Sequence, residues 1–452
     1  GLGGASGLLN INNGGQVNVI GEDARVTIGY GQENAAFGSD PESSILISSG
    51  GGLTVNSITN PDANLPYNAA AEIIVGDEIS GNGRLSVDGA GSQVIITSDN
   101  ATNFDTTGDI AVGAGLSVGA YGRGIVQVSN DGYILINGTD DPFTSLLIGL
   151  GDSENPSQAY GLLNAGGGGI VRLLSTNDGT GLPYSYGTAS SIVVGGYEGA
   201  TGVLTVTRGG KIYNDATNSV TYVGFRAGSY GRIEVTGVGS QFDAGQFLAV
   251  GAALDPTTGN IIQSGVGSGE LTIGPDGEVS ADQTDIGATG VITFNDGTLT
   301  SDLNVYGVLN VGISDGSDGR GTVQGDLTLT QDGALALDVQ QFNTLQDLIE
   351  ITGNATLAGD AITVNILNAG MYSVGDYVTL LSSDATLTVD TSLLTVPGAT
   401  AGAGAEFVVA TTTYAGSGPT EERLVLRVDQ ASLATQGGDL TAVAPLDGQV
   451  AI

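Results

Sequence analysis

The sequence predicts an all-β protein that folds as a parallel β-solenoid of about 20 coils, with loop inserts and a C-terminal capping region. Two short phrases of glycine and apolar residues recur along the chain, and they supply the strands of this prediction. The composition agrees with it, because 77 glycines accompany an apolar fraction of 40%. Such a chain can bury a thin core built from many small strands.

The first phrase reads glycine, any residue, apolar, any residue, apolar. Alternate side chains of a strand point to opposite faces of its sheet, so each copy predicts a strand with one buried face. The copies begin at Gly7, Gly51, Gly83, Gly124, Gly202, Gly231, Gly269, Gly290 and Gly307, with a weaker copy at Gly161. The apolar positions of four copies are expected to face one continuous core: Leu85, Val87, Val126, Val128, Leu204, Val206, Ile233 and Val235.

The second phrase is an apolar pair closed by glycine, and it falls between copies of the first. Its copies are Ile74-Val75-Gly76, Ala111-Val112-Gly113, Leu147-Ile148-Gly149, Val193-Val194-Gly195, Tyr222-Val223-Gly224 and Ala249-Val250-Gly251. Dipeptides typical of tight turns separate the phrases, at Asn13-Gly14, Asp131-Gly132, Gly209-Gly210, Asp276-Gly277 and Asp296-Gly297.

The spacing of the first phrase favours stacked coils over other β architectures. Copies up to Gly269 lie 29 to 44 residues apart, whereas Gly269, Gly290 and Gly307 are separated by 21 and 17 residues. One coil is therefore expected to take roughly 20 residues, and each longer module two coils. A β-sandwich would need regular hairpins and a propeller a stricter period. Stacked coils tolerate variable inserts such as Asp99–Thr107 and Asn177–Tyr186.

Three segments differ in their phrasing: residues 1–340 hold the Gly-rich repeats, residues 341–430 form a second solenoid region, and residues 431–452 are a polar tail. Residues 353–359 read Gly-Asn-Ala-Thr-Leu-Ala-Gly, and residues 375–381 read Gly-Asp-Tyr-Val-Thr-Leu-Leu. Residues 347–381 resemble the C-terminal end of autotransporter passenger domains, where this pair of phrases closes the β-helix. The upstream phrases are similar to autotransporter-associated repeats. The resemblance implies a right-handed β-helix that a Gram-negative bacterium secretes to its surroundings or its outer surface.

The charge of the chain excludes several classes of partner. Forty-eight acidic and 11 basic residues give a net charge of −37. Such a chain repels nucleic acid and anionic membrane surfaces. No apolar run is long enough to span a bilayer, so no direct membrane insertion is expected for this segment.

Catalysis is not expected. The chain has no histidine and a single lysine, Lys211, so Ser153 in the esterase-like phrase Gly-Asp-Ser lacks a general base. A carbohydrate-active β-helix enzyme with paired carboxylates is the alternative. Its candidate pairs are Asp140 with Asp141, or Asp88 and Asp131 on adjacent coils. Acids in Gly-rich turns also bind backbone amides without any catalytic role.

Calcium is the only cofactor that the sequence suggests. Asp315 and Asp318, in the run Ser-Asp-Gly-Ser-Asp-Gly, and Asp140 with Asp141 place hard oxygen ligands on turns. Neither the spacing of an EF-hand nor that of a calcium-binding β-roll is present, so turns without metal remain the alternative.

Three arginines occupy strand positions near the repeat glycines. Arg84, Arg123 and Arg232 either form a ladder with acids on neighbouring coils or are exposed strand residues of little energetic weight.

The two ends of the solenoid predict self-association. Gly7, Leu9 and Ile11 form a leading strand without a cap, and its open edge can accept another strand. Leu424, Leu426 and Val428, or the tail with Val443 and Val450, are the expected donors. Such head-to-tail contacts build open filaments. The sequence therefore predicts an extracellular structural or adhesive scaffold whose partners are further copies of itself, surface glycans or matrix.

Overall fold

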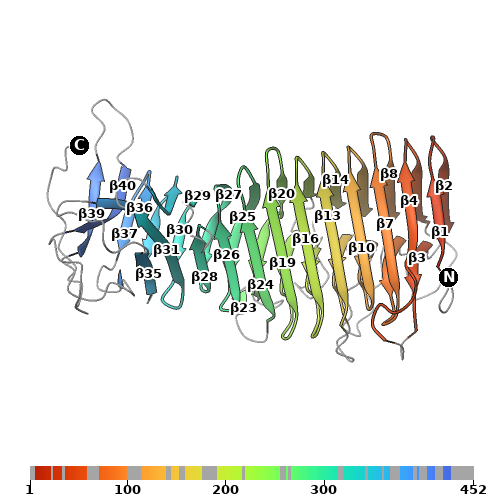
Figure 1. The fold of residues 1–452 in the computed structure, drawn as a ribbon, viewed down its shortest axis with the longest axis horizontal. Coiled ribbons are helices and arrows are strands. Elements are labelled where there is room, and N and C mark those ends of the chain that lie inside the picture. The colour runs from red at the N-terminus through yellow and green to blue at the C-terminus, as the bar shows by residue number, and fades with distance from the viewer. Residues whose placement is uncertain are drawn as a thin grey trace. The chain divides into compact units, whose positions relative to one another are not determined.

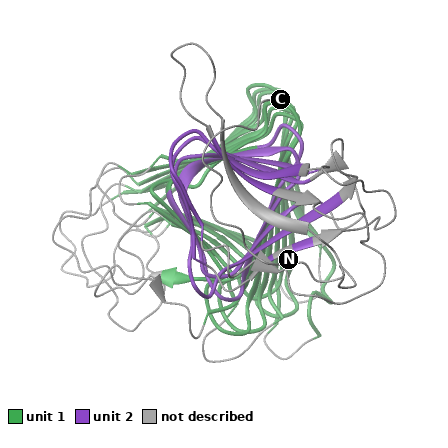
Figure 2. Ribbon diagram, turned by 90° about the vertical axis from the view of Figure 1, so that its left-hand side faces the viewer, with its two compact units in different colours: residues 1–271, 278–282 green, residues 272–277, 283–452 purple. Residues whose placement is uncertain are grey.

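The computed structural model shows an all-β chain of stacked coils (Figure 1). It describes residues 6–21, 24–32, 36–58, 71–98, 113–138, 144–151, 158–175, 191–215, 219–254, 261–262, 266–312, 319–341, 345–358, 361–366, 377–389, 394–395, 405–412 and 421–428. Nothing in these ranges forms a helix long and apolar enough to cross a bilayer. The chain divides into two compact units: unit 1 holds residues 1–271 and 278–282, and unit 2 holds residues 272–277 and 283–452 (Figure 2).

Seven coils of unit 1 each contribute one strand to each of three rows, and an eighth adds a strand to the first and second rows. The first row contains β1 (Leu8–Ile11), β4 (Ser43–Ser48), β7 (Asn82–Asp88), β10 (Arg123–Ser129), β13 (Tyr160–Gly166), β16 (Thr201–Thr207), β19 (Tyr230–Thr236) and β24 (Ser268–Ile273). The second row contains β2 (Gln16–Gly21), β5 (Gly52–Ser57), β8 (Gln93–Ser98), β11 (Tyr133–Gly138), β14 (Ile170–Ser175), β17 (Lys211–Asn214), β20 (Gln241–Asp243) and β25 (Glu278–Ile286). The third row contains β3 (Ala24–Tyr30), β6 (Ala71–Asp77), β9 (Ala114–Val118), β12 (Thr144–Ile148), β15 (Ser191–Val194), β18 (Val220–Val223) and β21 (Phe247–Val250). The short strands β22 (Ala253–Leu254) and β23 (Ile261–Ile262) form a separate antiparallel pair.

Unit 2, taken by itself, is also a stack of coils, and its coils are shorter. Its first-sheet strands are β26 (Gly290–Phe294), β28 (Val308–Val311), β31 (Ala334–Gln341), β35 (Ala361–Ile366) and β38 (Leu394–Thr395), with β32 (Leu345–Gln346) beside β31. The other sheet holds β27 (Gly297–Val305), β29 (Arg320–Gln324), β30 (Leu327–Leu329), β33 (Leu348–Ile351), β34 (Ala355–Leu357), β36 (Tyr377–Ser383), β37 (Leu387–Val389), β39 (Ala405–Thr412) and β40 (Glu421–Val428).

The predicted fold class is confirmed by the strand pairing. Within unit 1, strands of one row pair in parallel with the same row of the next coil, so that Leu85 lies beside Val126 and Leu204 beside Ile233. Corresponding strands overlie one another when unit 1 is seen end-on (Figure 2). All eight side chains expected in the core are 0% exposed: Leu85, Val87, Val126, Val128, Leu204, Val206, Ile233 and Val235.

The number of coils is lower than the sequence suggested. The first sheet has eight successive strands from β1 to β24 and five more in unit 2, so the described chain contains 13 coils and not about 20. From Gly83 to Gly269 the long spacing between copies of the first phrase is one coil with three strands and a connecting insert, not two coils. The copy predicted at Gly51 is in the second row instead, where Leu53 of β5 pairs with Val17 of β2, and β4 is the first-row strand of that coil. The inserts Asp99–Thr107 and Asn177–Tyr186 lie outside the described residues.

The two recurring phrases of unit 1 meet at one corner of the coil. Gly76, which closes the third-row strand β6, has φ +77°, a conformation that side chains other than glycine rarely adopt. A Cβ on Gly124, which opens the first phrase on the next coil, would overlap the oxygen of Val75 and the nitrogen of Gly119. The same contact repeats along the stack, between the first-phrase glycines Gly83, Gly161, Gly202, Gly231 and Gly269 and the strand-closing glycines Gly76, Gly149, Gly195, Gly224 and Gly251. Glycine in both phrases is therefore required for the coils to approach.

Register also locates the second phrase. In β9, Ser117 and Val118 pair with Ile74 and Val75 of β6. The third-row copy on this coil is therefore Ser117-Val118-Gly119. Of the copy predicted at Ala111-Val112-Gly113, Ala111 and Val112 fall outside the described residues, and Gly113 precedes β9. The expected tight turns are present: Asn13, Asp131, Asp276 and Asp296 all have positive φ.

The described C-terminal strands close the parallel ladder of unit 2 with antiparallel pairs. β36 pairs in parallel with β33 and antiparallel with β40, and β40 pairs antiparallel with β39. The expected segment boundary at residue 340 falls inside β31 and stays a prediction, and the tail 431–452 lies outside the described residues.

Candidate functional site

Most of the residues singled out for metal binding or catalysis lie outside the described residues. These are Asp140, Asp141, Ser153, Asp315 and Asp318. Among the residues that the structure describes, no three acidic side chains gather in a way that could hold a metal ion. Calcium binding at the undescribed turns stays a prediction.

The stacked acids Asp88 and Asp131 lie at the turn between the first and second rows. Asp88 Oδ1 accepts hydrogen bonds from Ser129 Oγ at 2.7 Å and from Asn130 Nδ2 at 2.7 Å on the next coil. Asn130 and Asp131 both have positive φ, as a tight turn requires. The carboxylate of Asp88 therefore holds two successive turns together.

The leading strand has one partner among the described residues. There β1 pairs only with β4, where Leu9 lies beside Ile45. Leu9 is 41% exposed and Ile45 only 7%, although Ile11 is already buried. Leu8 and Ile20 are 65% and 61% exposed. The first described coil thus presents several apolar side chains.

The expected strand donor is already paired. β40, which carries Leu424, Leu426 and Val428, has β36 on one edge and β39 on the other, and Leu424 is 0% exposed. In this fold neither edge of β40 is free to extend the sheet of another molecule. The tail residues Val443 and Val450 lie outside the described residues.

A regular grid of side chains covers the outer face of the first row from β7 to β19. Strand register places three lines of side chains across these five coils. The central line runs Arg84, Ile125, Leu162, Val203 and Arg232; the lines beside it run Asn82, Arg123, Tyr160, Thr201 and Tyr230, and Ser86, Gln127, Asn164, Thr205 and Glu234.

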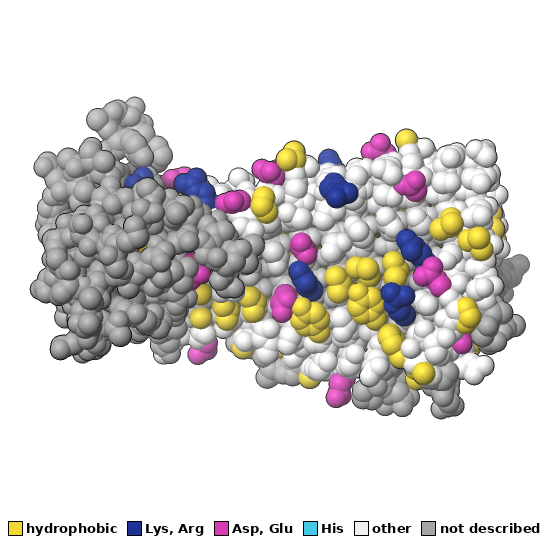
Figure 3. All heavy atoms as spheres, in the orientation of Figure 1, with side chains coloured by type: hydrophobic (Ala, Val, Ile, Leu, Met, Phe, Trp, Pro, Cys, Tyr) yellow, Lys and Arg dark blue, Asp and Glu magenta, His cyan; other side chains and the backbone are white. Residues whose placement is uncertain are grey.

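Hydrophobic and basic side chains gather on this face (Figure 3). We name Arg84, Arg123, Ile125, Tyr160, Leu162, Val203 and Arg232 the arginine-flanked patch. All are partly buried except Arg232, which is exposed. Outward positions of a strand are commonly polar, so three successive apolar residues on the central line mark a surface suited to contact.

The arginines of the patch do not form the predicted ladder with acids on neighbouring coils. Arg84 Nη2 donates to Gln127 Oε1 at 3.1 Å, and Arg123 Nη1 donates to Asn82 Oδ1 at 3.4 Å. Arg232 Nη2 pairs with Glu234 Oε2 at 3.0 Å, within its own strand. In the described chain Arg84 and Arg123 therefore have amide partners and no carboxylate.

Tyr230, at the far end of the patch, is held by an acid. Its hydroxyl donates to Glu270 Oε2 at 2.7 Å. Burial and this carboxylate raise the pKa of Tyr230 to about 12, so its hydroxyl stays protonated at neutral pH.

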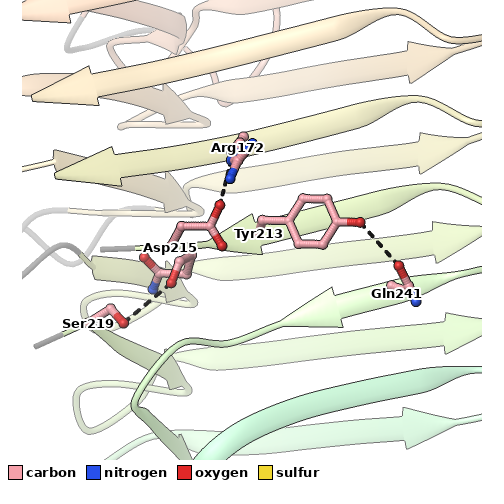
Figure 4. Close-up of polar contacts among 6 residues, drawn as sticks. Arg172, Tyr213, Asp215, Ser219 and Gln241 are labelled. Carbon is pink, nitrogen blue, oxygen red and sulfur yellow. Dashed lines mark hydrogen bonds and ion pairs between the residues drawn. The ribbon is translucent and has the colours of Figure 1, made fainter. Parts of the chain in front are cut away.

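On the outer face of the second row an arginine has an acidic partner (Figure 4). Arg172 of β14 forms an ion pair with Asp215, which follows β17 on the next coil, and the hydroxyl of Tyr213 donates to Gln241 Oε1 at 3.1 Å. Among the described residues Arg84 and Arg123 have no such partner.

The outer face of the third row is covered. Leu147 and Val193 point away from the coil interior by strand alternation, yet they are 1% and 3% exposed. They pack with Phe225 and Ala253 in a second apolar cluster. This explains the apolar pair of the second phrase, in which one residue faces the core and the other faces this cluster.

The sequence contained a signal for the arginine-flanked patch that the repeat pattern obscured. The repeat pattern allows any residue after its glycine. That residue is arginine after Gly83 and Gly231, and it is apolar after Gly124, Gly161 and Gly202. Only the strand register shows that these five residues form one line.

Comparison with known proteins adds little to this geometry. No family model matches the sequence, and no curated protein does. One solved structure that is similar bears the description "Crystal structure of TibC-catalyzed hyper-glycosylated TibA55-350 fragment"; it is 14% identical, with a TM-score of 0.27, over 86% of this chain and 99% of that chain. The assignment of a parallel β-helix rests on the strand pairing itself.

Proposed function

We propose that this chain is an extracellular structural or adhesive scaffold, displayed on or released from the surface of a Gram-negative bacterium. The observation that carries the proposal is the end of the parallel ladder in unit 2. The strands β34 and β36 contain the phrases that resemble the end of autotransporter passengers, and the ladder closes in antiparallel pairing at β36. The sequence resemblance assigns this closing role to those phrases.

The coil stack suits a scaffold. Each coil contacts its neighbours through backbone ladders, and its inward side chains are apolar, so stability comes from repetition and the outer faces are left for contacts. A net charge of −37 keeps the sides of such molecules apart in solution.

Labelling of intact cells tests the location. In a Gram-negative host that produces the natural full-length protein, antibodies against unit 1 should stain cells without permeabilisation, or detect the protein in the medium. A signal that appears only after permeabilisation would contradict an extracellular role.

Self-association through the first coil is the finer part of the proposal, with a second copy of this chain beside the edge of β1 that β4 does not use. The strands β1 and β2 contain no charged residue, whereas natural edge strands are commonly protected by charge. Exposed Leu8, Leu9 and Ile20 add apolar surface beside that edge. A strand or segment of another copy can complete both at once.

Light scattering and electron microscopy of the purified chain test this self-association. Leu9→Lys should shorten the assemblies, because it places a charge on the edge of β1 that β4 does not use, and Val238→Lys at a site 77% exposed should not. Deletion of residues 436–452 asks whether the tail supplies the contact. Assemblies unchanged by Leu9→Lys would refute the role of the first coil.

A further inference from the structure

The arginine-flanked patch is locally cationic on a strongly acidic chain. Its five strands, β7, β10, β13, β16 and β19, carry three arginines, Arg84, Arg123 and Arg232, against two acids, Asp88 and Glu234. The whole chain has 48 acids and 11 bases, so a strand surface with a net positive charge is unusual for it. Local charge of the opposite sign to the rest of the molecule favours an anionic partner at this place.

We propose that the arginine-flanked patch binds a linear acidic polysaccharide, with hexuronate carboxylates on Arg84 and Arg123 and the apolar faces of the sugar rings on Tyr160 and Leu162. The inference rests on the proposed extracellular role, because a chain outside the cell meets such polymers. It names the chemical class of the partner that the scaffold would hold.

The anion sites are two arginines that have no carboxylate partner among the described residues. Arg123 lies opposite Asn82, two residues before Arg84 on the adjacent strand, so the two arginines are diagonal neighbours in the register. Arg84 donates to Gln127, on the side of the central line away from Arg123, and Arg123 donates to Asn82. A guanidinium has five N–H donors in a planar fork that fits a carboxylate. Each arginine therefore keeps donors for a carboxylate of its own.

The apolar line explains why the anion should be part of a sugar. Ile125, Leu162 and Val203 lie side by side on three successive coils, with the ring of Tyr160 on the adjoining line. Ligand sites commonly combine such an apolar floor with a few polar groups that fix orientation. A pyranose ring offers C–H groups on its faces and hydroxyl groups around its edge.

Hydrogen-bonding groups for those hydroxyls lie on the other side of the apolar line. Gln127, Asn164 and Thr205 occupy three successive coils there. These groups repeat at the inter-strand distance of about 4.8 Å, so a polymer with a regular repeat can meet equivalent groups on successive coils.

Binding of defined oligomers to the purified chain tests this site. Oligogalacturonate should bind to the wild-type chain. Its methyl ester, which lacks the negative charge, should bind with an affinity lower by a factor of about ten or more. Arg84→Gln with Arg123→Gln should lower the affinity for oligogalacturonate about tenfold or more. Leu162→Thr should weaken binding of both the acid and the ester, because it removes part of the apolar floor.

A matched double variant controls for net charge. Arg172→Gln with Arg320→Gln removes the same two charges away from the patch and should leave the affinity unchanged. Unaltered thermal unfolding of each variant shows that the fold persists. The proposal fails if wild-type chain does not bind oligogalacturonate, if the patch variant binds as well as the control variant, or if poly-glutamate binds as tightly, which would indicate an acidic polypeptide partner. Because these measurements use purified protein, they are independent of the cell labelling that tests the extracellular role.

Discussion

Both units contain glycines that leave no room for a Cβ, but unit 2 differs from the corners of unit 1 by its buried carboxylates. In unit 1 the corner between the third and first rows is made by facing glycines, such as Gly76 and Gly124. Polar side chains span adjacent coils in both units, as Asp88 does in unit 1. The amide of Asp326 donates to Asp302 Oδ1 at 3.0 Å, and the amide of Asn354 donates to Asp326 Oδ1 at 2.7 Å.

Unit 2 also buries carboxylate side chains, whose charge depends on pH, unlike the glycine contacts at the corners of unit 1. Asp347 is 1% exposed and accepts hydrogen bonds from the amides of Gly319 at 3.0 Å and Asp338 at 2.6 Å. Asp285 is 0% exposed and accepts from Gln283 Nε2 and Asn304 Nδ2, both at 2.8 Å. Close backbone contact is indifferent to pH, whereas a buried carboxylate is not. The two units should therefore respond to different perturbations.

The largest effect is expected at a glycine corner of unit 1. Gly124→Val places side-chain atoms where Val75 and Gly119 already lie, so adjacent coils must separate. A loss of more than about 4 kcal/mol of local stability is expected. Hydrogen exchange should show early opening of β7 and β10. Gly21→Val is the matched control, because a Cβ at Gly21 meets nothing within 4 Å. Equal protection in the two variants would show that the corner does not need glycine.

A smaller loss is expected when a buried acceptor is removed from unit 2. Asp347→Ala leaves the buried amides of Gly319 and Asp338 without this acceptor, which costs about 2–4 kcal/mol in total. Hydrogen exchange measured during chemical denaturation should locate the loss of stability at β29 and β31. The stability of unit 1 should be unchanged. Asp332→Ala at an exposed turn is the control. A loss confined to unit 1 would contradict the assignment of this carboxylate to unit 2 stability.

The smallest effect is a pH dependence of unit 2 that comes from Asp285. Burial raises the pKa of Asp285 from its ordinary value of 3.8 to about 6, despite the hydrogen bonds from Asn304 and Gln283 that lower it. Between these values the folded state holds a proton that the unfolded state has lost. Unit 2 should therefore gain up to about 2–3 kcal/mol as the pH falls from 7 toward 4, and lose it again as the pH rises through 6.

Asp285→Asn separates this group from the other acids of the chain. In this variant the free energy of unfolding of unit 2 should change little between about pH 4 and about pH 7. Asp302→Asn, at an exposed site, should keep the wild-type slope. A wild-type slope in Asp285→Asn would assign the pH dependence to another carboxylate.

The positions of the strands could be predicted from the sequence because buried apolar residues alternate with outward-facing residues within each strand. Insertions between the strands do not change this alternation. The pairs Leu85 with Val87 and Ile233 with Val235 are recognisable without any knowledge of neighbouring coils. The number of coils was not predictable in this way, since the third-row strand and the insert beside it lengthen one coil to the spacing expected of two. Spacing alone does not distinguish these cases.

The functional surface depends on contacts between coils, which sequence spacing does not reveal. Arg84 and Arg123 are 39 residues apart and become diagonal neighbours only through the register of β7 and β10. The burial of Asp285 and Asp347 was also missed, because an aspartate in a Gly-rich sequence reads as a turn residue. The sequence also does not reveal that β36 and β39 flank the strand of Leu424, so it could not exclude this residue as a strand donor.

The repeated glycine corner has a genetic consequence. From Gly83 to Gly269 each coil begins and ends with the same pair of contacts, so the sequence between two of these copies of the first phrase encodes one whole coil. Unequal recombination between the copies at Gly83 and Gly124 would join Asn82 directly to Gly124 and recreate an intact phrase. The neighbouring coils could then stack in their usual register. A gene of this kind can gain or lose coils in single steps, and the length of the encoded molecule can change without any new packing arrangement.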